Sequence, residues 1–472
     1  MVSDRLKPFL NYLQFKMECA AYQEQNPIRL DYDACLKHIE TLEKEQEERV
    51  EALKGIMPAV ESVTHRNKPK VMFKKNGDLS ANGEKWLALL REHKLPPTYN
   101  KPVPIVVGYE EPNPNSTDQV KSWLFSLGWE PCTYKYLRDK STGKERKIEQ
   151  VRKDGELTDS VLALKDKAPE VEILEGLTVI QHRLGIFKGF VECAVSRDGK
   201  WYLKAEVAGL TNTLRFKHKK PLVNLPGVDK PWGKEIRSCL QADEGEIFVG
   251  ADMVSLEDTT KRHYIQPYDP EYVEEMSKEG FDPHLDLALH AGVVTEEEIE
   301  KHKLGEINLG PLRKSYKVVN YSAVYGVGAA KLSRETGMSV KEAKKLLEDY
   351  WKRNWAVQYV AKKQKVKEVG GRMWLLNPVS GFWHELRYEK DRWSTTNQST
   401  AVYVFDSWLA RARLYGWQGQ LQFHDETGGS VANESQAIEA LQKGVERLNA
   451  DLTLNVPFAI DVNTGSNYAD VH

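Results

Sequence analysis

The chain has 472 residues, of which 40% are hydrophobic and 29% are charged, and its formal net charge is −2. This composition is typical of a globular protein with a sizeable core and excludes a disordered chain. No apolar run is long enough to cross a bilayer, and the N-terminus lacks the apolar segment of a secretory signal, so we expect a cytoplasmic protein with no membrane partner. Five scattered cysteines, none in a C-x-x-C pair, favour a reducing compartment. Taken alone, the near-neutral charge argues against a nucleic-acid-binding protein.

The N-terminal part of the chain combines helical patterns with a proline-rich stretch. Residues 31–56 carry apolar residues near helical spacing and predict one long amphipathic helix. Residues 57–115 contain eight prolines around a short helix predicted at 83–93. We interpret residues 57–115 either as an inserted subdomain that binds a partner or as a decorated connector.

Lysines and arginines gather in two segments that follow a helix predicted at 117–129. Residues 135–153 hold eight of them, interrupted by three acidic residues, and residues 215–220 read Arg-Phe-Lys-His-Lys-Lys. A charge run is most often a solvated loop. Basic segments with aromatic residues nearby also suit a surface that follows a phosphate backbone, so both interpretations stay open.

Three segments could carry chemistry, and the first is a short apolar run. Residues 246–252 end on Asp252, and Glu257 follows five residues later. The run predicts a buried strand. A carboxylate at the end of such a strand can hold a metal ion or cap the following helix, and on this segment alone the cap is favoured.

The second segment, residues 310–326, predicts a helix with a proline in its first turn. Side chains spaced four residues apart share one stripe of that helix, and they are Arg313, Lys317, Tyr321 and Tyr325. Such a stripe could clamp a triphosphate with its cations and stack a ring on a base and sugar. Periodicity alone favours an ordinary helix face with surface cations and core tyrosines.

The third segment, residues 421–431, alternates in polarity and then turns through His424, Asp425 and Glu426. This pattern predicts a β-hairpin that presents two adjacent carboxylates. The alternative is a turn in which Asp only forms local hydrogen bonds. A Ser-His-Asp hydrolase is excluded because no G-x-S-x-G elbow precedes the segment.

Together the segments supply two distant carboxylates, Asp252 and Asp425, with a cationic helix between them in sequence. Carboxylates can hold two divalent ions roughly 3.5–4 Å apart, which activate a hydroxyl and stabilise a leaving oxygen. Mg²⁺ suits carboxylate and phosphate oxygens, and Mn²⁺ can take its place. The combination indicates two-metal phosphoryl transfer.

In order and spacing, these segments resemble the three motifs of family A DNA polymerases, bacteriophage type. The helix matches the pattern R-x(3)-K-x(3)-[FY]-x(3)-Y-G. Similar stretches extend the resemblance from about Asn26 onward, and they are Thr213–Arg215, Pro221–Val228, Lys234–Arg237, Asp282–His284, Asn397–Ala401 and Gly465–His472. The resemblance implies an α+β right-hand fold with a palm of antiparallel sheet, fingers and a helical thumb.

The resemblance also implies where each domain lies. We expect an N-terminal palm-side segment at 1–26, a thumb at 27–185 with the inserted subdomain at about 57–115, the first part of the palm at 186–270, fingers at 271–384 and the second part of the palm at 385–472. Family members that proofread carry an exonuclease domain ahead of the thumb. Only about 25 residues precede the thumb here, so we expect no 3′→5′ exonuclease in this chain.

Individual residues receive roles by the same resemblance. Asp252 and Asp425 would hold the metal ions, with Glu426 in support and Lys317 beside them as a catalytic cation. The nucleotide would be bound by Arg313, Lys317, Tyr321, His284 and Glu257, of which Glu257 would block a 2′-hydroxyl. DNA would be contacted by Tyr325, Arg215, Gln398, His424, Lys217, Lys219 and Lys220.

The implied activity is template-directed 5′→3′ DNA synthesis from deoxynucleoside triphosphates on a primer–template, in viral DNA replication within a host cell cytoplasm. A processivity factor or a separate exonuclease subunit would be a further partner. A single-subunit RNA polymerase is the alternative against which Glu257 argues. A non-catalytic DNA-binding replication protein would not need both metal carboxylates, and a reverse transcriptase is disfavoured because no Tyr-x-Asp-Asp turn occurs.

Overall fold

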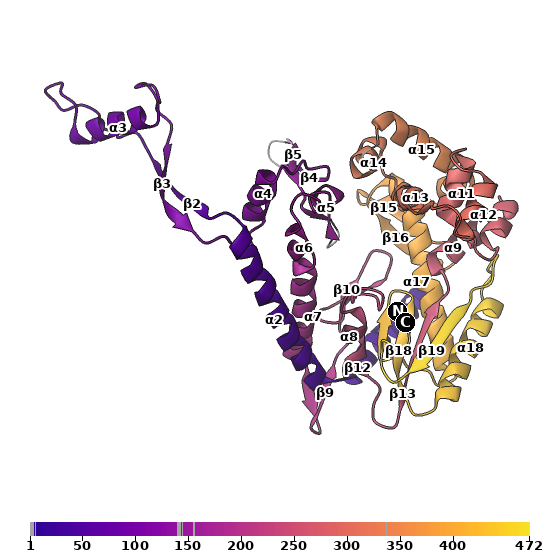
Figure 1. The fold of residues 1–472 in the computed structure, drawn as a ribbon. Coiled ribbons are helices and arrows are strands. Elements are labelled where there is room, and N and C mark those ends of the chain that lie inside the picture. The colour runs from indigo at the N-terminus through magenta and orange to yellow at the C-terminus, as the bar shows by residue number, and fades with distance from the viewer. Residues whose placement is uncertain (1–3, 5, 139–142, 144, 154–155, 337) are drawn as a thin grey trace. The chain divides into compact units, whose positions relative to one another are not determined.

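The computed structural model describes the whole chain except residues 1–3, 5, 139–142, 144, 154–155 and 337. Two compact units make up the fold, one of Met1–Thr41 with His182–His472 and one of Leu42–Gln181 (Figure 1). Two helices, α2 (Tyr32–Ile56) and α7 (Leu177–Cys193), run across the boundary in sequence. In the part of the chain that is described, no helix has the length and apolar character needed to span a bilayer.

The larger unit is built on an antiparallel sheet with the strand order β17-β18-β13-β19. Its strands are β13 (Ile247–Met253), β17 (Leu421–Phe423), β18 (Glu426–Val431) and β19 (Ile460–Gly465). The four residues from Phe248 to Ala251 in the central strand β13 are all buried, as their continuous apolar character predicts. The buried strand predicted before Asp252 is therefore confirmed.

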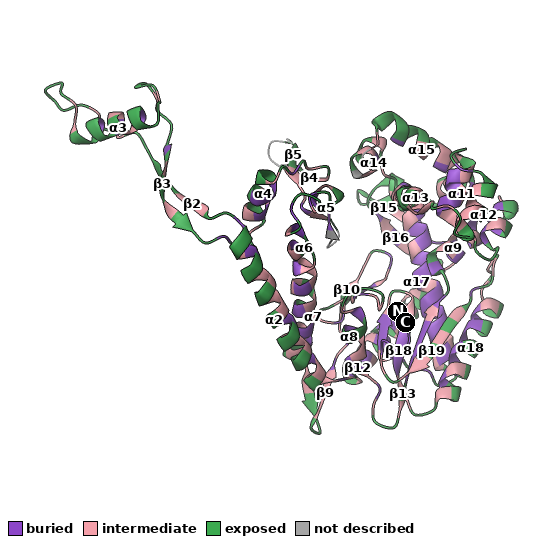
Figure 2. Ribbon diagram, in the orientation of Figure 1, coloured by how far each residue is buried: buried purple, intermediate pink, exposed green. Residues whose placement is uncertain are grey.

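Two long helices, α17 (Arg392–Arg413) and α18 (Glu434–Asp451), pack against this sheet. Apolar residues of β13 and of both helices form one core, in which Trp408 is fully buried. Figure 2 shows α17 coloured as buried over much of its length. The helices approach closely because α18 has a glycine at the contact: a Cβ on Gly444 would lie 2.9 Å from the Cβ of Ala412.

A series of helices lies between β13 and β14 in the sequence. Its helices are α9 (Leu256–Ile265), α10 (Pro270–Met276), α11 (Pro283–His290), α12 (Glu296–Lys303), α13 (Gly310–Val324), α14 (Ala329–Thr336), α15 (Val340–Arg353) and α16 (Trp355–Lys363). Side chains of Asp269, Asp282, Thr295 and Ser339 accept backbone N–H groups at the starts of α10, α11, α12 and α15. These caps satisfy donors that a helix leaves unpaired at its first turn.

Smaller elements complete the larger unit. They are α1 (Lys7–Gln25), α8 (Gly233–Ser238), the 3₁₀ helix η1 (Glu389–Asp391), a sheet of β1 (Ile28–Leu30), β8 (Val195–Arg197), β9 (Lys200–Leu203) and β12 (Leu240–Gln241), a hairpin of β10 (Val207–Leu210) and β11 (Phe216–His218), and a sheet of β14 (Val366–Val369), β15 (Arg372–Leu376) and β16 (Trp383–Leu386). All of these strand pairs are antiparallel.

The smaller unit carries a long two-stranded ribbon of β2 (Val60–Arg66) and β3 (Val103–Glu110), with α3 (Ala81–Glu92) at its far end (Figure 1). Its remaining elements are α4 (Thr117–Ser126), β4 (Tyr134–Arg138), β5 (Glu145–Glu149), β6 (Arg152–Lys153), β7 (Glu156–Leu157), α5 (Asp159–Leu162) and α6 (Val171–Leu174). Trp86, Leu90 and Val103 form a small core of their own at the ribbon's end.

The helices predicted near 31–56, 83–93 and 117–129 are confirmed as α2, α3 and α4, with ends that differ by a few residues. The basic stretch 135–153 overlaps the hairpin β4–β5, and its Lys140 and Lys144 lie outside the described residues. Helices and antiparallel sheets confirm the α+β class. The domain boundaries drawn from the sequence stay a prediction.

Candidate active site

Acidic residues gather at one end of the β17-β18-β13-β19 sheet. In the antiparallel register, Asp252 of β13 pairs with Glu426 of β18 on one side and with Asp461 of β19 on the other. The backbone N–H of Met253 donates to the carbonyl oxygen of Asp425 at 3.0 Å, which holds Asp425 beside the same strand end. The fold thus brings Asp252 and Asp425 together although they are distant in sequence.

This crowding of negative charge changes how the carboxylates titrate. Burial raises the pKa of Asp252 above its ordinary value, and the charges of three neighbouring carboxylates raise it further. Burial also raises the pKa of Glu257 in the first turn of α9, where Arg215 opposes the shift and Asp425 adds to it. A cation bound between the carboxylates would relieve their repulsion.

The residues present fit divalent ions of the Mg²⁺ or Mn²⁺ type. Among the described residues, no group of three or more His, Cys, Asp or Glu side chains forms a complete metal cage. Mg²⁺ commonly binds through one or two carboxylates and completes its shell with substrate phosphates and water. Asp252 and Asp425 are the residues that would hold such ions, because they meet at the strand end.

Glu426 is held by residues close to the C-terminal end of the sequence. The hydroxyl of Tyr468 donates to one carboxylate oxygen at 3.1 Å, and Nε2 of His472 lies 3.1 Å from the other. The guanidinium of Arg237 lies 4.7 Å from the centre of the Tyr468 ring. These contacts hold the carboxylate of Glu426 in place at the start of β18.

Asp252 does not cap the helix that follows it. The N-cap of α9 is Ser255, which adopts the left-handed conformation at φ 47° and makes no capping hydrogen bond with its side chain. The cap interpretation, favoured for this segment in isolation, is therefore wrong. The sharp turn at Ser255 separates the strand end from the helix, and Asp252 stays paired with the neighbouring strands.

The predicted hairpin is confirmed, with His424 and Asp425 between β17 and β18. His424 adopts the left-handed conformation at φ 59°, and its ring centre lies 5.9 Å from that of His218 in β11. Burial lowers the pKa of both histidines, that of His218 to about 4. Both imidazoles are therefore neutral at physiological pH, and His424 adds no charge beside Asp425.

The predicted helix at 310–326 is confirmed as α13, with a proline in its first turn. Arg313, Lys317 and Tyr321 lie within it, whereas Tyr325 is the C-cap, one residue beyond the last helical position. Tyr321 is 59% exposed and Tyr325 is 45% exposed. The alternative of core tyrosines on an ordinary helix face is therefore wrong, because both rings are available to a ligand.

Helix α11 lies against α13 and adds to this surface. Nε of Arg313 donates to the carboxylate of Asp282, the N-cap of α11. The ring of His284 lies 5.9 Å from that of Tyr321, and the ammonium of Lys317 lies 5.9 Å from the same ring. Burial lowers the pKa of His284, so its neutral ring can donate or accept a hydrogen bond. The four predicted nucleotide-binding residues of α11 and α13 are neighbours.

Helix α17 connects the two groups of predicted site residues. Nε2 of Gln398 donates to the hydroxyl of Tyr325 at 3.2 Å, and Nδ2 of Asn397 donates to the backbone oxygen of Glu257 at 3.0 Å. Consecutive residues of one helix therefore reach the end of α13 and the start of α9. This gives the carboxylate end of the sheet and the cationic helix a common support.

The basic residues in and beside β11 do not all lie near the carboxylate end of the sheet. Arg215 acts electrostatically on both Glu257 and His424, so it lies near the carboxylate end. Lys217 is exposed in β11, and the ammonium of Lys219 lies 3.8 Å from the carboxylate of Glu206. Lys220 follows the strand and is exposed as well. The lysines form an outer basic edge beside Arg215.

The contacts of two residues of this site escape prediction from the sequence. Asp461 has no local signal, because it joins the carboxylates only through the register of β19. Asp282 carries the common signal of a helix start, an Asp directly before a proline, but its contact with Arg313 depends on how α11 packs.

Comparisons with known proteins identify relatives of this chain. A family model described as "DNA polymerase family A" matches residues 98–470. The chain is 25% identical over 377 residues to "DNA polymerase I, thermostable" of Thermus filiformis, and 23% identical over 406 residues to "DNA-directed DNA polymerase" of Escherichia phage T7. Each match covers 76% of this chain, and 42% and 53% of those proteins. The chain thus spans about half the length of the curated relatives it matches.

A solved structure shows the same fold at low sequence identity. The POL domain of Pol1 from M. smegmatis, in complex with DNA primer-template and dNTP, aligns with a TM-score of 0.63 and 18% identity. The alignment covers 96% of this chain and 70% of that one. The expected right-hand polymerase fold is confirmed by this likeness.

Proposed function

Because the chain belongs to DNA polymerase family A, we propose that it is a template-directed 5′→3′ DNA polymerase that extends a primer with deoxynucleoside triphosphates in phage DNA replication. The observation that best supports this activity is that Asp252 and Asp425 meet at one end of the antiparallel sheet. The polymerase of phage T7 among the relatives supports the viral role. The structural neighbour is bound to a DNA primer-template and dNTP, and this supports the substrates proposed for this chain.

In the proposed reaction the primer 3′-hydroxyl attacks the α-phosphorus of the nucleotide. A new phosphorus–oxygen bond forms, the bond to pyrophosphate breaks, and the hydroxyl proton passes to water. Two divalent ions, when bound, favour the deprotonated hydroxyl and neutralise the leaving oxygens. Asp252 and Asp425 would hold these ions, with Glu426 in support. Arg313 and Lys317 would orient the triphosphate and stabilise the charge that develops on the leaving group.

Selection of the nucleotide would fall to residues around α9, α11 and α13. Tyr321 would lie against the sugar and His284 beside the triphosphate, while Glu257 would exclude a 2′-hydroxyl. The bond from Asn397 to the backbone of Glu257 supports a fixed position for that side chain. This feature separates the proposed enzyme from a single-subunit RNA polymerase, and a comparison of deoxynucleotide and ribonucleotide incorporation on a primed template decides between them.

The primer–template would follow the exposed residues of the larger unit. Tyr325 would stack near the templating position, where the contact with Gln398 supports its orientation. Arg215 and Gln398 would read minor-groove acceptors that every correct base pair presents. His424 would lie next to the primer end, and the backbone phosphates would be met by Lys217, Lys219 and Lys220.

Substitution of Asp425 tests the proposal. We expect Asp425→Asn to reduce primer extension on the order of a thousandfold or more, while primer–template affinity is kept, because a metal carboxylate is lost and the DNA surface is not. The matched control is Asp451→Asn, which removes a carboxylate that pairs with Arg411 at the end of α18. Normal extension by Asp425→Asn would refute the proposal. DNA binding without extension by the unsubstituted protein would favour the non-catalytic replication protein.

We further propose that the ribbon of β2 and β3 receives a processivity factor. Apolar side chains that are well exposed on and beside this ribbon support a protein partner, and they are Val71 at 65%, Phe73 at 59%, Val107 at 62% and Tyr109 at 69%. A Phe73→Ser, Tyr109→Ser variant should lose any gain in product length that a host-cell fraction gives the unsubstituted protein.

We also propose that this chain works in the cytoplasm, which is that of the host cell if the protein is viral. A second statement is that proofreading comes from a separate subunit. Rapid Mg²⁺-dependent digestion of single-stranded DNA by the pure protein would contradict the second statement.

A further inference from the structure

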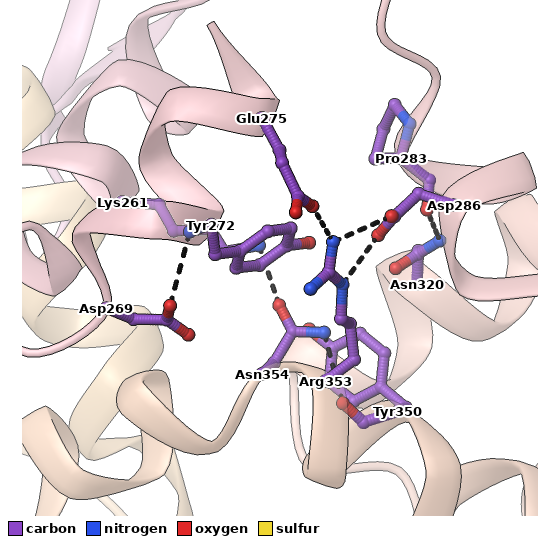
Figure 3. A network of polar contacts seen from close by, with 10 residues as sticks. All are labelled: Lys261, Asp269, Tyr272, Glu275, Pro283, Asp286, Asn320, Tyr350, Arg353 and Asn354. Carbon is purple, nitrogen blue, oxygen red and sulfur yellow. Dashed lines mark hydrogen bonds and ion pairs between the residues drawn. The ribbon is translucent and has the colours of Figure 1, made fainter. Parts of the chain in front are cut away.

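Arg353, at the end of α15, is the centre of a polar network to which the proposed function assigns no role (Figure 3). Its Nε donates to one oxygen of Asp286 at 3.0 Å and its terminal nitrogen donates to the other at 2.8 Å. The same nitrogen donates to Glu275, and the guanidinium lies 4.0 Å from the centre of the Tyr272 ring. One side chain therefore joins α15 to α10 and α11. Since its side chain is only 17% exposed and that of Asp286 only 12%, the pair is largely shielded from water.

The next residue extends the network toward the sheet. Asn354 is buried, and its side-chain oxygen accepts a hydrogen bond from the ammonium of Lys261 in α9 at 2.7 Å. Its backbone N–H donates to Tyr350 at 2.8 Å, which closes α15 before α16 begins. Helix α9 starts with Glu257 in its first turn and follows β13 directly. The junction of α15 and α16 is thus tied both to α11 and to the helix next to the carboxylates.

Helix α11, which Arg353 holds through Asp286, is in turn bonded to α13. Asp286 and Asp282 lie one turn apart on α11, and Asp282 pairs with Arg313. Nδ2 of Asn320 in α13 donates to the backbone oxygen of Pro283 at 3.0 Å. The first turn of α11 is therefore the support on which α13 rests. A displacement of α11 would displace the partner of Arg313.

We propose that Arg353 is a positioning residue that sets the nucleotide-binding surface of α11 and α13 by holding α11 through Asp286. It touches neither the substrate nor the reacting atoms and acts only through the helix it holds. The two parallel bonds to one carboxylate need a planar guanidinium, so a lysine would keep the charge but lose the geometry. This inference rests on the proposed function and deepens it by naming a determinant of nucleotide affinity.

Steady-state kinetics of Arg353→Gln and Arg353→Lys test the inference, with rates divided by the concentration of active sites from a burst measurement. We expect Arg353→Gln to raise the KM for the nucleotide by about tenfold or more, because small displacements of positioning groups have effects of this size. Its kcat should stay within about threefold and its primer–template Kd should not change. The KM of Arg353→Lys should lie between those of the unsubstituted protein and Arg353→Gln. The control is Lys352→Gln, which alters a neighbouring cation that is 70% exposed.

A merely structural role predicts a different result. It would lower the fraction of active enzyme and leave the KM of each active site unchanged, which would overturn the inference. If Arg353→Gln does not fold, Asp286→Asn replaces it, and an unchanged KM in that variant is equally decisive against the inference. Failure of the unsubstituted protein to extend primers would instead overturn the proposed function.

Discussion

Asp252 is held in surroundings that favour its protonated form, since burial and neighbouring carboxylates raise its pKa. The pKa in the folded state therefore lies above that in the unfolded state, and the folded protein binds this proton more readily. Between the two values the stability contribution of Asp252 falls as pH rises, and above the folded-state pKa the full penalty is present. The same repulsion that weakens the fold creates affinity for a cation.

Asp252→Asn should therefore stabilise the protein in the absence of metal. We expect the melting temperature at pH 8 in EDTA to rise by about 1–2 °C. The gain should vanish below a pH of about 3, where Asp is largely protonated in both states. Added Mg²⁺ should raise the melting temperature of the unsubstituted protein more than that of the variant. A lower melting temperature of the variant at pH 8 in EDTA would contradict this account.

Residues whose neighbours lie on the same helix are the ones the sequence predicts well. Arg313, Lys317 and Tyr321 are neighbours because of helical spacing alone, and α13 confirms this. Asp461 and Arg353 acquire their neighbours from elements far away in sequence, through the register of β19 and the packing of α15 against α11. Local patterns carry no information about such contacts.

At the scale of elements, a buried ion pair fixes α1 to α17 within the larger unit. The ammonium of Lys16 donates to both carboxylate oxygens of Asp406 in α17, at 2.9 and 2.7 Å, and each side chain is 2% exposed. The hydroxyl of Tyr12 donates to the same carboxylate, and the ammonium lies 4.1 Å from the centre of the Phe216 ring. Helix α1 thereby supports α17, which carries Gln398 and Asn397.

Breaking this pair from one side should be costly. Lys16→Met leaves a buried carboxylate without its cation, and we expect a loss of about 3 kcal/mol in the free energy of unfolding, measured by urea denaturation. The double variant Lys16→Met, Asp406→Leu should recover much of that loss, because no charge is left unpaired. As a control, Lys7→Met, which removes an exposed partner of Asp4, should change stability by less than about 1 kcal/mol. Equal effects of Lys16→Met and Lys7→Met would be inconsistent with the role assigned to α1.

Elements with a strong hydrophobic pattern or a strong helix-capping signal are predictable from the sequence. The helix α2 follows from its apolar spacing, and β13 follows from its continuous apolar run. The hairpin β4–β5 does not, because four of the five residues of β5 are charged and hide any alternation in that strand. The turn at Ser255 is also invisible locally, and this is why a cap by Asp252 looked favourable from the sequence.

At the scale of the whole molecule, the net charge of −2 is a poor guide to partners. Basic residues concentrate at the β10–β11 hairpin and acidic ones at the start of α12, where three consecutive glutamates occupy the first turn. Phosphates respond to the local field rather than to the sum of charges. A chain that is nearly neutral can therefore still present a basic surface to DNA.

The salt dependence of DNA binding measures that local field. Substitution of Lys217, Lys219 and Lys220 by alanine should weaken primer–template binding and reduce the slope of log Kd against log salt by about two to three, since each phosphate contact releases roughly one counterion. Fluorescence anisotropy at several salt concentrations gives the slope. Alanine at Lys301 and Lys303, which pair with glutamates on α12, should leave it unchanged. The same slope in both variants would remove the hairpin from the DNA surface.

The strand order β17-β18-β13-β19 also has a consequence during synthesis on the ribosome. β13 emerges first, but both of its partners are translated only after the helices α9 to α17. Those helices can form from local contacts while β13 still has unpaired edges, which are the usual starting point of aggregation in a nascent chain. A ribosome-bound chain that has passed Asp425 but not residue 460 contains both metal-binding candidates and lacks the strand that completes the sheet around Asp252.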